Sequence, residues 1–427
     1  MSEGSETAFL KTALSSLRPN SWKLLREHAE EIIRATPLPS QDQEEWKYID
    51  LQSVFSQAYN PATNNIIKPL WIGASSATET AHSLLVITNG QLDSNQSNTS
   101  SVDNGIVFSS LTNSAKDFPE KHEYVGKLAC PSNSDMFSNI NTACFEDGVF
   151  IYIPKGRSPL TPLHIIFRAT SQASDVTPII FPRILVVLEP GAKAHIVEEY
   201  FGEGKYLTNS VLEIFLGEGA SLAHDRTQHE SMSAFHFCTL CIDIGQKAKY
   251  TSTSISMGGS ISRQKPICKF TGEHGELELN YLSLVNTTQI ADTHSTIEHQ
   301  VPNCTSKQVQ KFIVDNSAHG IFRGQIKVHQ MAQGTSASQS SRNLLLAKDA
   351  KIDTMPQLEI LADDVKCSHG ATVGQLDAEE LFYLQSRGLD LDSAKNILLV
   401  GFATDIINHI SLPSIRNSLL QKVLKQG

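Results

Sequence analysis

Short apolar runs separated by turn residues dominate the middle of the chain, from about residue 145 to residue 375. Runs such as 148–153, 183–188 and 210–216 are rich in β-branched and aromatic residues, and Gly, Asp and Asn punctuate them. This region lacks the spacing of apolar residues that a long amphipathic helix requires. The pattern therefore predicts a region built almost entirely of strands.

The strand-rich region also repeats itself. Three segments share a plan of apolar residue, turn, alanine and second apolar residue, and their alanines, Ala192, Ala220 and Ala248, each lie 28 residues after the one before. The plan returns around Ala350 and Val365. A fixed period indicates stacked units, and strand-only units of this length favour a β-helix, in which each coil buries its apolar side against the next. A β-sandwich is the alternative, although its strands recur at shorter intervals.

The first 60 residues have a different pattern. Residues 20–34 combine a polar start with apolar residues at helical spacing, and two prolines follow directly. Residues 61–144 are rich in Ser, Asn and Thr, with a strand-like run at 84–88. We expect an N-terminal helical region followed by a mixed segment that leads into the core.

Helical patterns return after the strand-rich region. Asp377, with Glu380 three residues later, has the form of a helix cap, and two more helices are expected at about 391–409 and 413–425. The expected domains are a helical region (1–60), a mixed segment (61–144), a β-helix core (145–375) and a C-terminal helical region (376–427).

Composition narrows the class of protein. A chain of 427 residues with 40% hydrophobic and 19% charged residues can bury a substantial core. The net charge of −10 argues against a nucleic-acid partner, and no apolar run is long enough to span a membrane. The acidic start resembles neither a secretory signal nor a transit peptide. Seven irregularly spaced cysteines are too few for a disulfide framework, so we expect reduced thiols in the cytoplasm.

Motifs for common catalytic chemistry are absent from the sequence. It contains no phosphate-binding Gly-x-x-x-x-Gly-Lys-[Ser/Thr], no Gly-x-Ser-x-Gly and no His-Glu-x-x-His. Cys238 and Cys241 have the spacing of a zinc or redox pair. In a strand, however, residues three apart face opposite sides, so two unrelated core thiols are the favoured interpretation.

Two further clusters contain residues that bind metals. His294, Glu298 and His299, with Cys304 nearby, favour a hydrogen-bonded structural role because no second segment supplies partners. Cys367 and His369 lie two residues apart, so strand alternation points the thiol and the imidazole to the same side, and both groups bind iron or zinc. Spacing alone leaves their role open, because two ligands do not close a metal site.

Several longer segments together resemble the SufB/SufD family of iron–sulfur cluster assembly scaffolds. The resemblance extends from the region of Trp46 to the second C-terminal helix. The segments that carry it are 45–51, 182–186, 209–220, 296–306, 342–346, 356–377 and 381–388. The family's fold is a right-handed parallel β-helix between helical ends, so the resemblance implies a mostly β protein and agrees with the interpretation of the repeat.

Two features separate the branches of this family. Members of the SufB branch carry a cysteine before the paired leucines, whereas residues 339–346 of this chain contain no thiol. The SufB branch also has acidic residues beside its histidine, where this chain has Ser368 and Gly370. The resemblance is therefore to the SufD branch.

The resemblance implies partners and a site. It implies a non-catalytic subunit that pairs with SufB through the β-helix and with the SufC ATPase through the C-terminal helices, and that binds no nucleotide itself. His369, and more weakly Cys367, would contact a transient iron–sulfur cluster shared with SufB. A homodimer of the isolated chain stays open. The residues expected to contact SufC are Leu381, Phe382, Arg387, Phe402 and Ile406.

Two alternative functions are compatible with a β-helix. A carbohydrate lyase or hydrolase would usually need a secretory route and an open groove of charged side chains. A primary scaffold of the SufB type would carry the cysteine that is missing before Leu344. Capture of an ATP-binding partner would separate the scaffold from the glycan enzyme.

Overall fold

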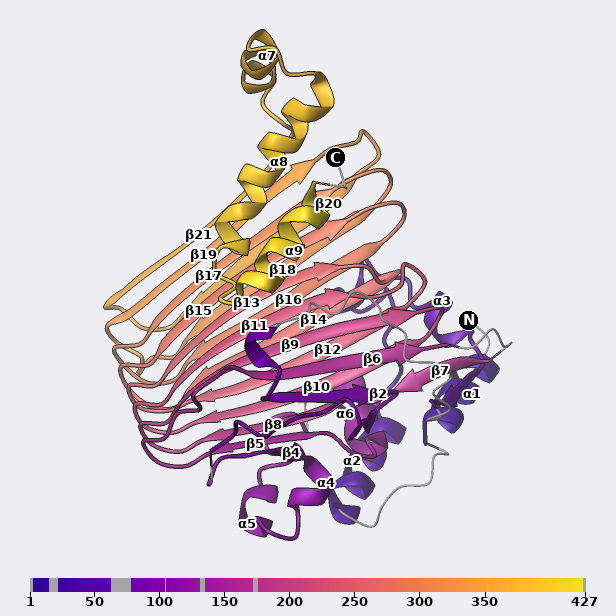
Figure 1. Ribbon diagram of the computed structural model, residues 1–427, viewed down its shortest axis with the longest axis vertical. Helices are drawn as coiled ribbons and strands as arrows, with labels where there is room; N and C mark the ends of the chain where they lie inside the picture. Colours follow the sequence, from indigo (N-terminus) through magenta and orange to yellow (C-terminus); the bar gives the residue numbers. More distant parts are fainter. Residues whose placement is uncertain are drawn as a thin grey trace.

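The computed structural model describes residues 3–14, 22–62, 78–103, 105–130, 135–171 and 176–424. Its centre is a parallel β-helix in which the chain alternates between two facing sheets, A and B (Figure 1). Sheet A comprises β4 (Val107–Ser110), β5 (Val149–Ile153), β8 (Arg183–Leu188), β10 (Leu207–Leu216), β12 (Phe235–Ile244), β14 (Ile261–Phe270), β16 (Ile290–His299), β18 (His319–Val328) and β20 (Lys351–Ile360), with β7 (Thr177–Ile180) beside β10 and β1 (Tyr59–Pro61) beside β7. Sheet B comprises β3 (Gln91–Leu92), β2 (Leu84–Thr88), β6 (Leu163–Thr170), β9 (Lys193–Glu203), β11 (Ser221–His229), β13 (Lys249–Met257), β15 (Glu276–Val285), β17 (Thr305–Val314), β19 (Thr335–Leu345) and β21 (Val365–Gly374).

The strand register explains the sequence repeat. Ser221 of β11 pairs with Lys249 of β13 in a parallel ladder, so one coil here contains the 28 residues of the repeat. The repeated alanines Ala192, Ala220 and Ala248 precede β9, β11 and β13, and all three are fully buried. The predicted β-helix is confirmed, and the sandwich alternative is wrong, because successive coils stack as parallel strands.

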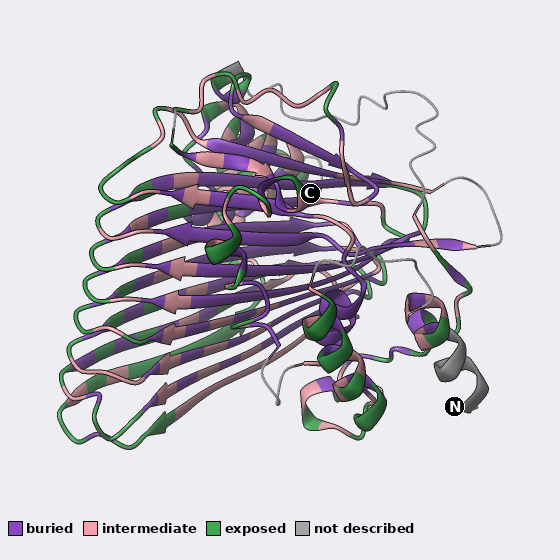
Figure 2. Cartoon of the chain, turned by 90° about the horizontal axis from the view of Figure 1, so that it is seen from below, coloured by how far each residue is buried: buried purple, intermediate pink, exposed green. Residues whose placement is uncertain are grey.

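Each strand turns alternate side chains into the space between the sheets. A large apolar cluster fills one side of this space along most of the solenoid, with Leu212, Leu240 and Ile326 from sheet A opposite Leu222 and Leu279 from sheet B. The strands are largely buried, whereas residues at the turns between them are exposed (Figure 2).

Helices that precede the first long strands cover the outer face of sheet A. Trp46 packs against Phe137 and Phe237, with ring centroids 5.5 and 6.3 Å apart, and its other neighbour is the guanidinium of Arg263, 4.0 Å from the ring. The elements on this side and around it are α1 (Glu3–Leu14), α2 (Lys23–Ala35), the 3-10 helix η1 (Glu44–Trp46), α3 (Gln52–Phe55), α4 (Leu111–Ser114), α5 (Pro119–His122) and α6 (Met136–Cys144). A second 3-10 helix, η2 (Thr78–Thr80), lies instead beside sheet B, where Thr80 contacts His164 of β6 and Glu79 contacts Ser414 of α9.

The C-terminal helices are α7 (Ala378–Ser386), α8 (Leu391–Ile407) and α9 (Pro413–Val423). Helices α8 and α9 pack on the outer face of sheet B, where Leu399 and Ile406 join Ile255, Leu282 and Ile313 in one buried apolar cluster. Asp377 caps α7, since its Oδ1 accepts from the backbone N–H groups of Glu379 and Glu380 at 2.7 and 3.2 Å.

The mixed segment supplies strands to both sheets. Strand β2 extends sheet B by pairing in parallel with β6, and β4 pairs antiparallel with β5 in sheet A. The expected helix at 20–34 is observed from Lys23 onward, and its first residues lie outside the described chain, as does residue 425 at the expected end of the last helix. Within the described ranges, no helix is long and apolar enough to cross a membrane.

Candidate functional site

Cys367 and His369 lie on β21, the last strand of sheet B. Strand β21 pairs in register with β19, where Ala337 stands opposite Cys367 and Gln339 opposite His369. Ala337 and Gln339 are 3% and 2% exposed, because alternate side chains of β19 point between the sheets. Since parallel register partners face the same side, Cys367 and His369 both point inward, as their spacing predicts.

The two side chains nevertheless differ in their surroundings. Cys367 is half-buried and packs against the end of the apolar cluster inside the solenoid. Burial raises the pKa of its thiol above the ordinary value, although a hydrogen bond with the backbone of Ala337 offsets part of this rise. The thiol is therefore protonated near neutral pH. His369 is exposed, because no further strand follows β21 in sheet B.

Both sheets end in uncovered strands at this end of the solenoid. Strands β20 and β21 have ten residues each, and both are the terminal strands of their sheets. Val373 and Ile360 at this end are 45% and 38% exposed. Long uncovered edge strands offer unpaired backbone groups to other chains, so proteins normally shorten, charge or cover them. This end of the solenoid therefore has the properties of a strand-pairing surface.

Helix α7 forms a second exposed surface, which lies away from the solenoid at the top of Figure 1. None of its residues is buried. Phe382 and Tyr383 are 72% and 56% exposed, Leu381 is half-buried, and the guanidinium of Arg387 lies 5.2 Å from the Tyr383 ring. Exposed neighbouring aromatic residues with an adjacent arginine are typical of protein-binding surfaces.

The remaining two candidate contact residues lie on α8 and serve the packing of the chain itself. Ile406 is 2% exposed within the cluster between α8 and sheet B. Phe402 is half-buried, and the ammonium group of Lys311 lies 4.4 Å from its ring while donating to its backbone oxygen. These two residues hold α8 against sheet B.

The other candidate cysteines and histidines lie on different faces of the solenoid and do not form one site with Cys367 and His369. Cys238 points inward, whereas Cys241 packs outside the solenoid with Ala129 and Val211, so the two thiols face opposite sides as predicted. His294 lies beside Arg263 on the outer face, where burial first and then the positive charge of Arg263 lower its pKa to about 3.

The side chains of the histidine-rich segment form hydrogen bonds on both faces of strand β16. Glu298 Oε1 lies 2.8 Å from His329 Nε2 on the outside, while His299 Nε2 lies 2.9 Å from Ser306 Oγ inside. Cys304 lies at a turn and donates to the backbone oxygens of Gly272 and Pro302. In the part of the chain that the structure describes, no group of three or more His, Cys, Asp or Glu side chains could hold a metal ion.

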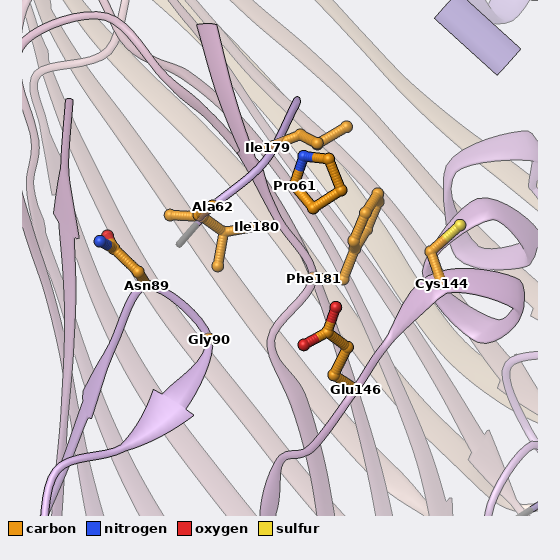
Figure 3. A pocket seen from close by; sticks show the side chains of 9 residues that line it. All are labelled: Pro61, Ala62, Asn89, Gly90, Cys144, Glu146, Ile179, Ile180 and Phe181. Atoms are coloured by element: carbon orange, nitrogen blue, oxygen red, sulfur yellow. The ribbon is translucent and has the colours of Figure 1, made fainter. Parts of the chain in front are cut away.

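A pocket near the N-terminal end of the solenoid is too small for an organic substrate. Glu146, Cys144 and Phe181 line it together with residues of β1 and the turn at Asn89 (Figure 3). Its free volume of about 20 Å³ accommodates about one water molecule. This pocket therefore provides no basis for a reaction on a sugar.

Sequence reasoning missed a polar interior. Ser306, Gln308 and Gln310 are at most 2% exposed and point between the sheets from β17, and Gln339 and Ser341 follow in β19. The sequence did carry a signal, because polar residues occupy every second position of these runs. These positions form one strand face, and Val309 and Lys311 lie on the opposite, outward face.

Two sequence families match consecutive parts of the chain. Residues 11–165 match the SufBD protein N-terminal region, and residues 167–402 match the SufBD core domain of SUF system FeS cluster assembly. The two matches together cover most of the chain. Their boundary falls within β6, after the first strands of both sheets.

Curated relatives match over nearly the full length. A SufBD family iron–sulfur cluster assembly protein of Synechocystis is 35% identical over 93% of this chain and 89% of its own length. The chloroplast protein ABCI7 of Arabidopsis thaliana is 30% identical over 96% of this chain and 87% of its own length. The iron–sulfur cluster assembly protein SufD of Escherichia coli is 26% identical over 93% and 91%.

Proposed function

Because the chain belongs to the SufBD family of the SUF system for iron–sulfur cluster assembly, we propose that it is a non-catalytic scaffold subunit of a SufBCD complex. The observation that carries this proposal is the uncovered end of the solenoid, where β20 and β21 terminate both sheets beside Cys367 and His369. A scaffold acts by holding groups of several subunits together, and this end presents both backbone edges and candidate ligands.

The first partner is SufB, which pairs with β20 and β21. Strand addition to an exposed edge uses main-chain hydrogen bonds for affinity and side-chain contacts for specificity. Two strands of ten residues each provide an edge in both sheets at once. Covering them would also bury Val373 and Ile360, which are exposed in the single chain.

The shared iron–sulfur cluster is the cargo of this interface. His369 is accessible and can bind iron through its imidazole, while Cys367 must lose its proton before its sulfur binds. Two ligands from this chain leave further positions on iron for SufB groups. His369 is therefore the stronger candidate. Cys367 binds iron only if the free energy of binding exceeds the cost of removing the proton from its thiol, whose pKa is raised.

The second partner is the SufC ATPase, which binds α7. Phe382 and Tyr383 supply exposed aromatic surface, and Leu381 and Arg387 lie on the same short helix. ATP hydrolysis belongs to SufC, in keeping with a sequence that has no phosphate-binding loop. Deleting all residues after Asp377 would not test SufC binding alone. The deletion would also remove α8 and α9, which cover apolar residues of sheet B, and would therefore destabilise the solenoid.

The decisive experiment is anaerobic assembly of the purified complex. The chain is co-purified with SufB and SufC, and cluster formation is followed by visible absorption after iron and sulfide are supplied. We expect a cluster in the complex and none when Val373→Lys disrupts the uncovered edge. Phe382→Ala should reduce SufC retention and leave SufB bound. Normal assembly and normal subunit retention in the Val373→Lys variant would contradict the proposed interface.

A further inference from the structure

Residues 44–48, between α2 and α3, form a strap across the outer face of sheet A. The ring of Trp46 lies 6.3 Å from that of Phe237 on β12. Tyr48 reaches the terminal strand, where its hydroxyl lies 4.0 Å from the sulfur of Met355 on β20. The strap thus contacts sheet A from β12 to β20, a width of roughly 19 Å at the usual strand spacing.

Two carboxylates of the strap pair with basic side chains of the strands beneath it. Glu45 Oε1 accepts from Arg263 Nη2 at 2.6 Å and from Lys265 Nζ at 2.7 Å, both on β14. Glu44 Oε1 accepts from Arg323 Nη2 of β18 at 2.9 Å. Burial alone would raise the pKa of Glu45, but the charges of Lys265 and Arg263 outweigh it and lower the pKa to about 2. Glu45 therefore keeps its charge, and its contact with β14, at neutral and mildly acidic pH.

The strap supports the first half of β20 in two ways. Tyr48 contacts Met355 directly, and it also meets the ring of His319 on β18 edge-on, with centroids 6.1 Å apart. His319 Nε2 in turn lies 2.6 Å from Asp353 Oδ2 of β20. In the second half of the strand, Glu359 instead accepts from a glutamine of β18 at 3.3 Å. The two halves of β20 therefore differ in whether Tyr48 lies over them.

A terminal strand depends on such contacts more than an inner strand does. Within the described residues, β20 has β18 on one side and no strand of sheet A on the other. Each coil of a solenoid is stabilised by its neighbours, so the last coil opens locally most easily unless another element covers it. A strand that opens must be ordered again before it pairs with another chain, and this ordering lowers the affinity.

We propose that the strap is a positioning element that holds β20 in its pairing conformation, with Tyr48 as the main contact, and thereby raises the affinity for the chain that extends sheet A. The inference rests on the proposed strand pairing with SufB. The strap lies on the outer face of sheet A, whereas Cys367 and His369 lie on β21 of sheet B, so the strap acts on the association of subunits and not on iron binding. It also connects the N-terminal helices to the open end of the solenoid.

Hydrogen exchange of the isolated, unmodified chain tests the strap without a partner. Alternate amides of β20 donate to the coil that contains β18, beginning with Lys351. Of these amides, those of Asp353 and Met355 lie beneath Tyr48 and its neighbour, whereas those of Gln357 and Glu359 do not. After correction for intrinsic rates, the first two should exchange roughly tenfold more slowly or more than the other two. Equal protection in both halves of β20 would overturn the proposal.

Tyr48→Ala removes the contact with β20. Exchange at Asp353 and Met355 should become roughly tenfold faster, while exchange in β21 should stay unchanged, and SufB affinity measured by surface plasmon resonance should fall roughly tenfold. Tyr48→Phe keeps the ring, and the hydroxyl is 4.0 Å from the sulfur, so this variant should match the unmodified chain in both measurements. Normal protection of β20 or normal SufB affinity in the Tyr48→Ala variant would overturn the proposal.

Tyr124→Ala is the matched control. Tyr124 is also half-buried on the outer face of sheet A, but its ring packs 4.6 Å from that of Phe215 on β10, five strands away from β20. Thermal unfolding measures the stability that each truncation removes. Tyr124→Ala should leave the protection of β20 and the SufB affinity unchanged, and changes as large as those in Tyr48→Ala would show a global effect and overturn the proposal. Failure of the unmodified chain to bind SufB would instead contradict the proposed strand pairing, and exchange in the isolated chain would then test the strap alone.

Discussion

Gln339 and His369 are register partners in the last two strands of sheet B, yet Gln339 is buried and His369 is exposed. The difference arises because β19 is covered by β21, whereas β21 is covered by no strand of sheet B. One more coil, supplied by a partner, would place His369 in an environment like that of Gln339. The histidine therefore lies where a second subunit would enclose it.

The first prediction concerns His369→Ala. Because His369 is exposed, its truncation removes no buried hydrogen bond, and the free energy of unfolding should change by less than about 0.5 kcal/mol. Association with SufB and SufC should persist, while anaerobic cluster formation should be lost. Gel filtration of the complex and visible absorption measure the two outcomes separately.

Cys367→Ser in the same complex is the companion variant. Loss of the cluster in both variants would support two ligands from this chain, and loss in His369→Ala alone would leave Cys367 as a half-buried packing thiol. Cluster assembly at the normal rate by His369→Ala in an intact complex would contradict the site.

The second prediction concerns the buried ion pair of Arg183 and Glu213. Both side chains have no exposure, and Glu213 also accepts from the backbone N–H groups of Gly126, Leu128 and Ala129. Arg183→Met leaves the carboxylate buried without its cation, which should lower the free energy of unfolding by about 3–5 kcal/mol. Urea denaturation of the isolated chain measures the change.

Lys249→Met is the matched control for this variant. Lys249 forms an ion pair with Glu276 at 3.1 Å, but both side chains are more than half exposed. Exposed pairs contribute about 0–1 kcal/mol, so this variant should unfold at nearly the same urea concentration as the unmodified chain. Similar losses of unfolding free energy in both variants would show that burial does not make the Arg183–Glu213 pair more stabilising than an exposed pair.

The repeat in the sequence predicted the coil because the structural cause is local. Ala192, Ala220 and Ala248 occupy equivalent turns, and Asp377 caps a helix through its own nearby backbone. The alternation that paired Cys367 with His369 also follows from strand geometry alone. Features that depend only on neighbouring residues were thus accessible without a structure.

Other features depend on contacts between distant segments. Ile406 has the apolar character of a partner contact, but α8 folds back on sheet B and buries it against residues more than 90 positions earlier, such as Ile313. The polar interior was missed for a similar reason. A polar residue at every second position identifies one face of a strand, but the other elements of the fold determine whether that face meets solvent.

The third prediction concerns the exposed aromatic surface of α7. Phe382→Ala should weaken SufC binding roughly tenfold or more, since exposed aromatic residues that become buried often dominate binding energy. The unfolding transition should stay in place, because no residue of α7 is buried. Surface plasmon resonance with immobilised SufC measures the affinity.

Leu160→Ala is a control with a comparable change of exposed apolar surface, since Leu160 is 82% exposed in the loop between β5 and β6. It should leave SufC affinity unchanged. Equal SufC affinities of the Phe382→Ala variant and the unmodified chain would show that SufC does not bind this surface of α7.

The fourth prediction is a loss of stability on mild acidification. Burial lowers the pKa of His299 from 6.5 to about 4, and its ring stacks on Phe270 with centroids 4.4 Å apart. Between these two pH values the unfolded chain binds more protons than the folded chain, so protonation of this residue favours unfolding as the pH falls. Its contribution is complete above about pH 6.5 and declines toward pH 4 by up to about 1.4 kcal/mol per pH unit.

His299→Gln isolates this contribution. The glutamine amide reaches the position of His299 Nε2, which lies 2.9 Å from Ser306 Oγ, so it can keep this hydrogen bond, and it does not titrate. The free energy of unfolding of each chain is measured by urea denaturation from pH 7.5 to pH 4.5, and the difference between the two chains removes the effects of other groups that titrate alike in both. The variant should lose less stability than the unmodified chain below pH 6.5. Parallel curves throughout this range would show that His299 is not held neutral by the fold.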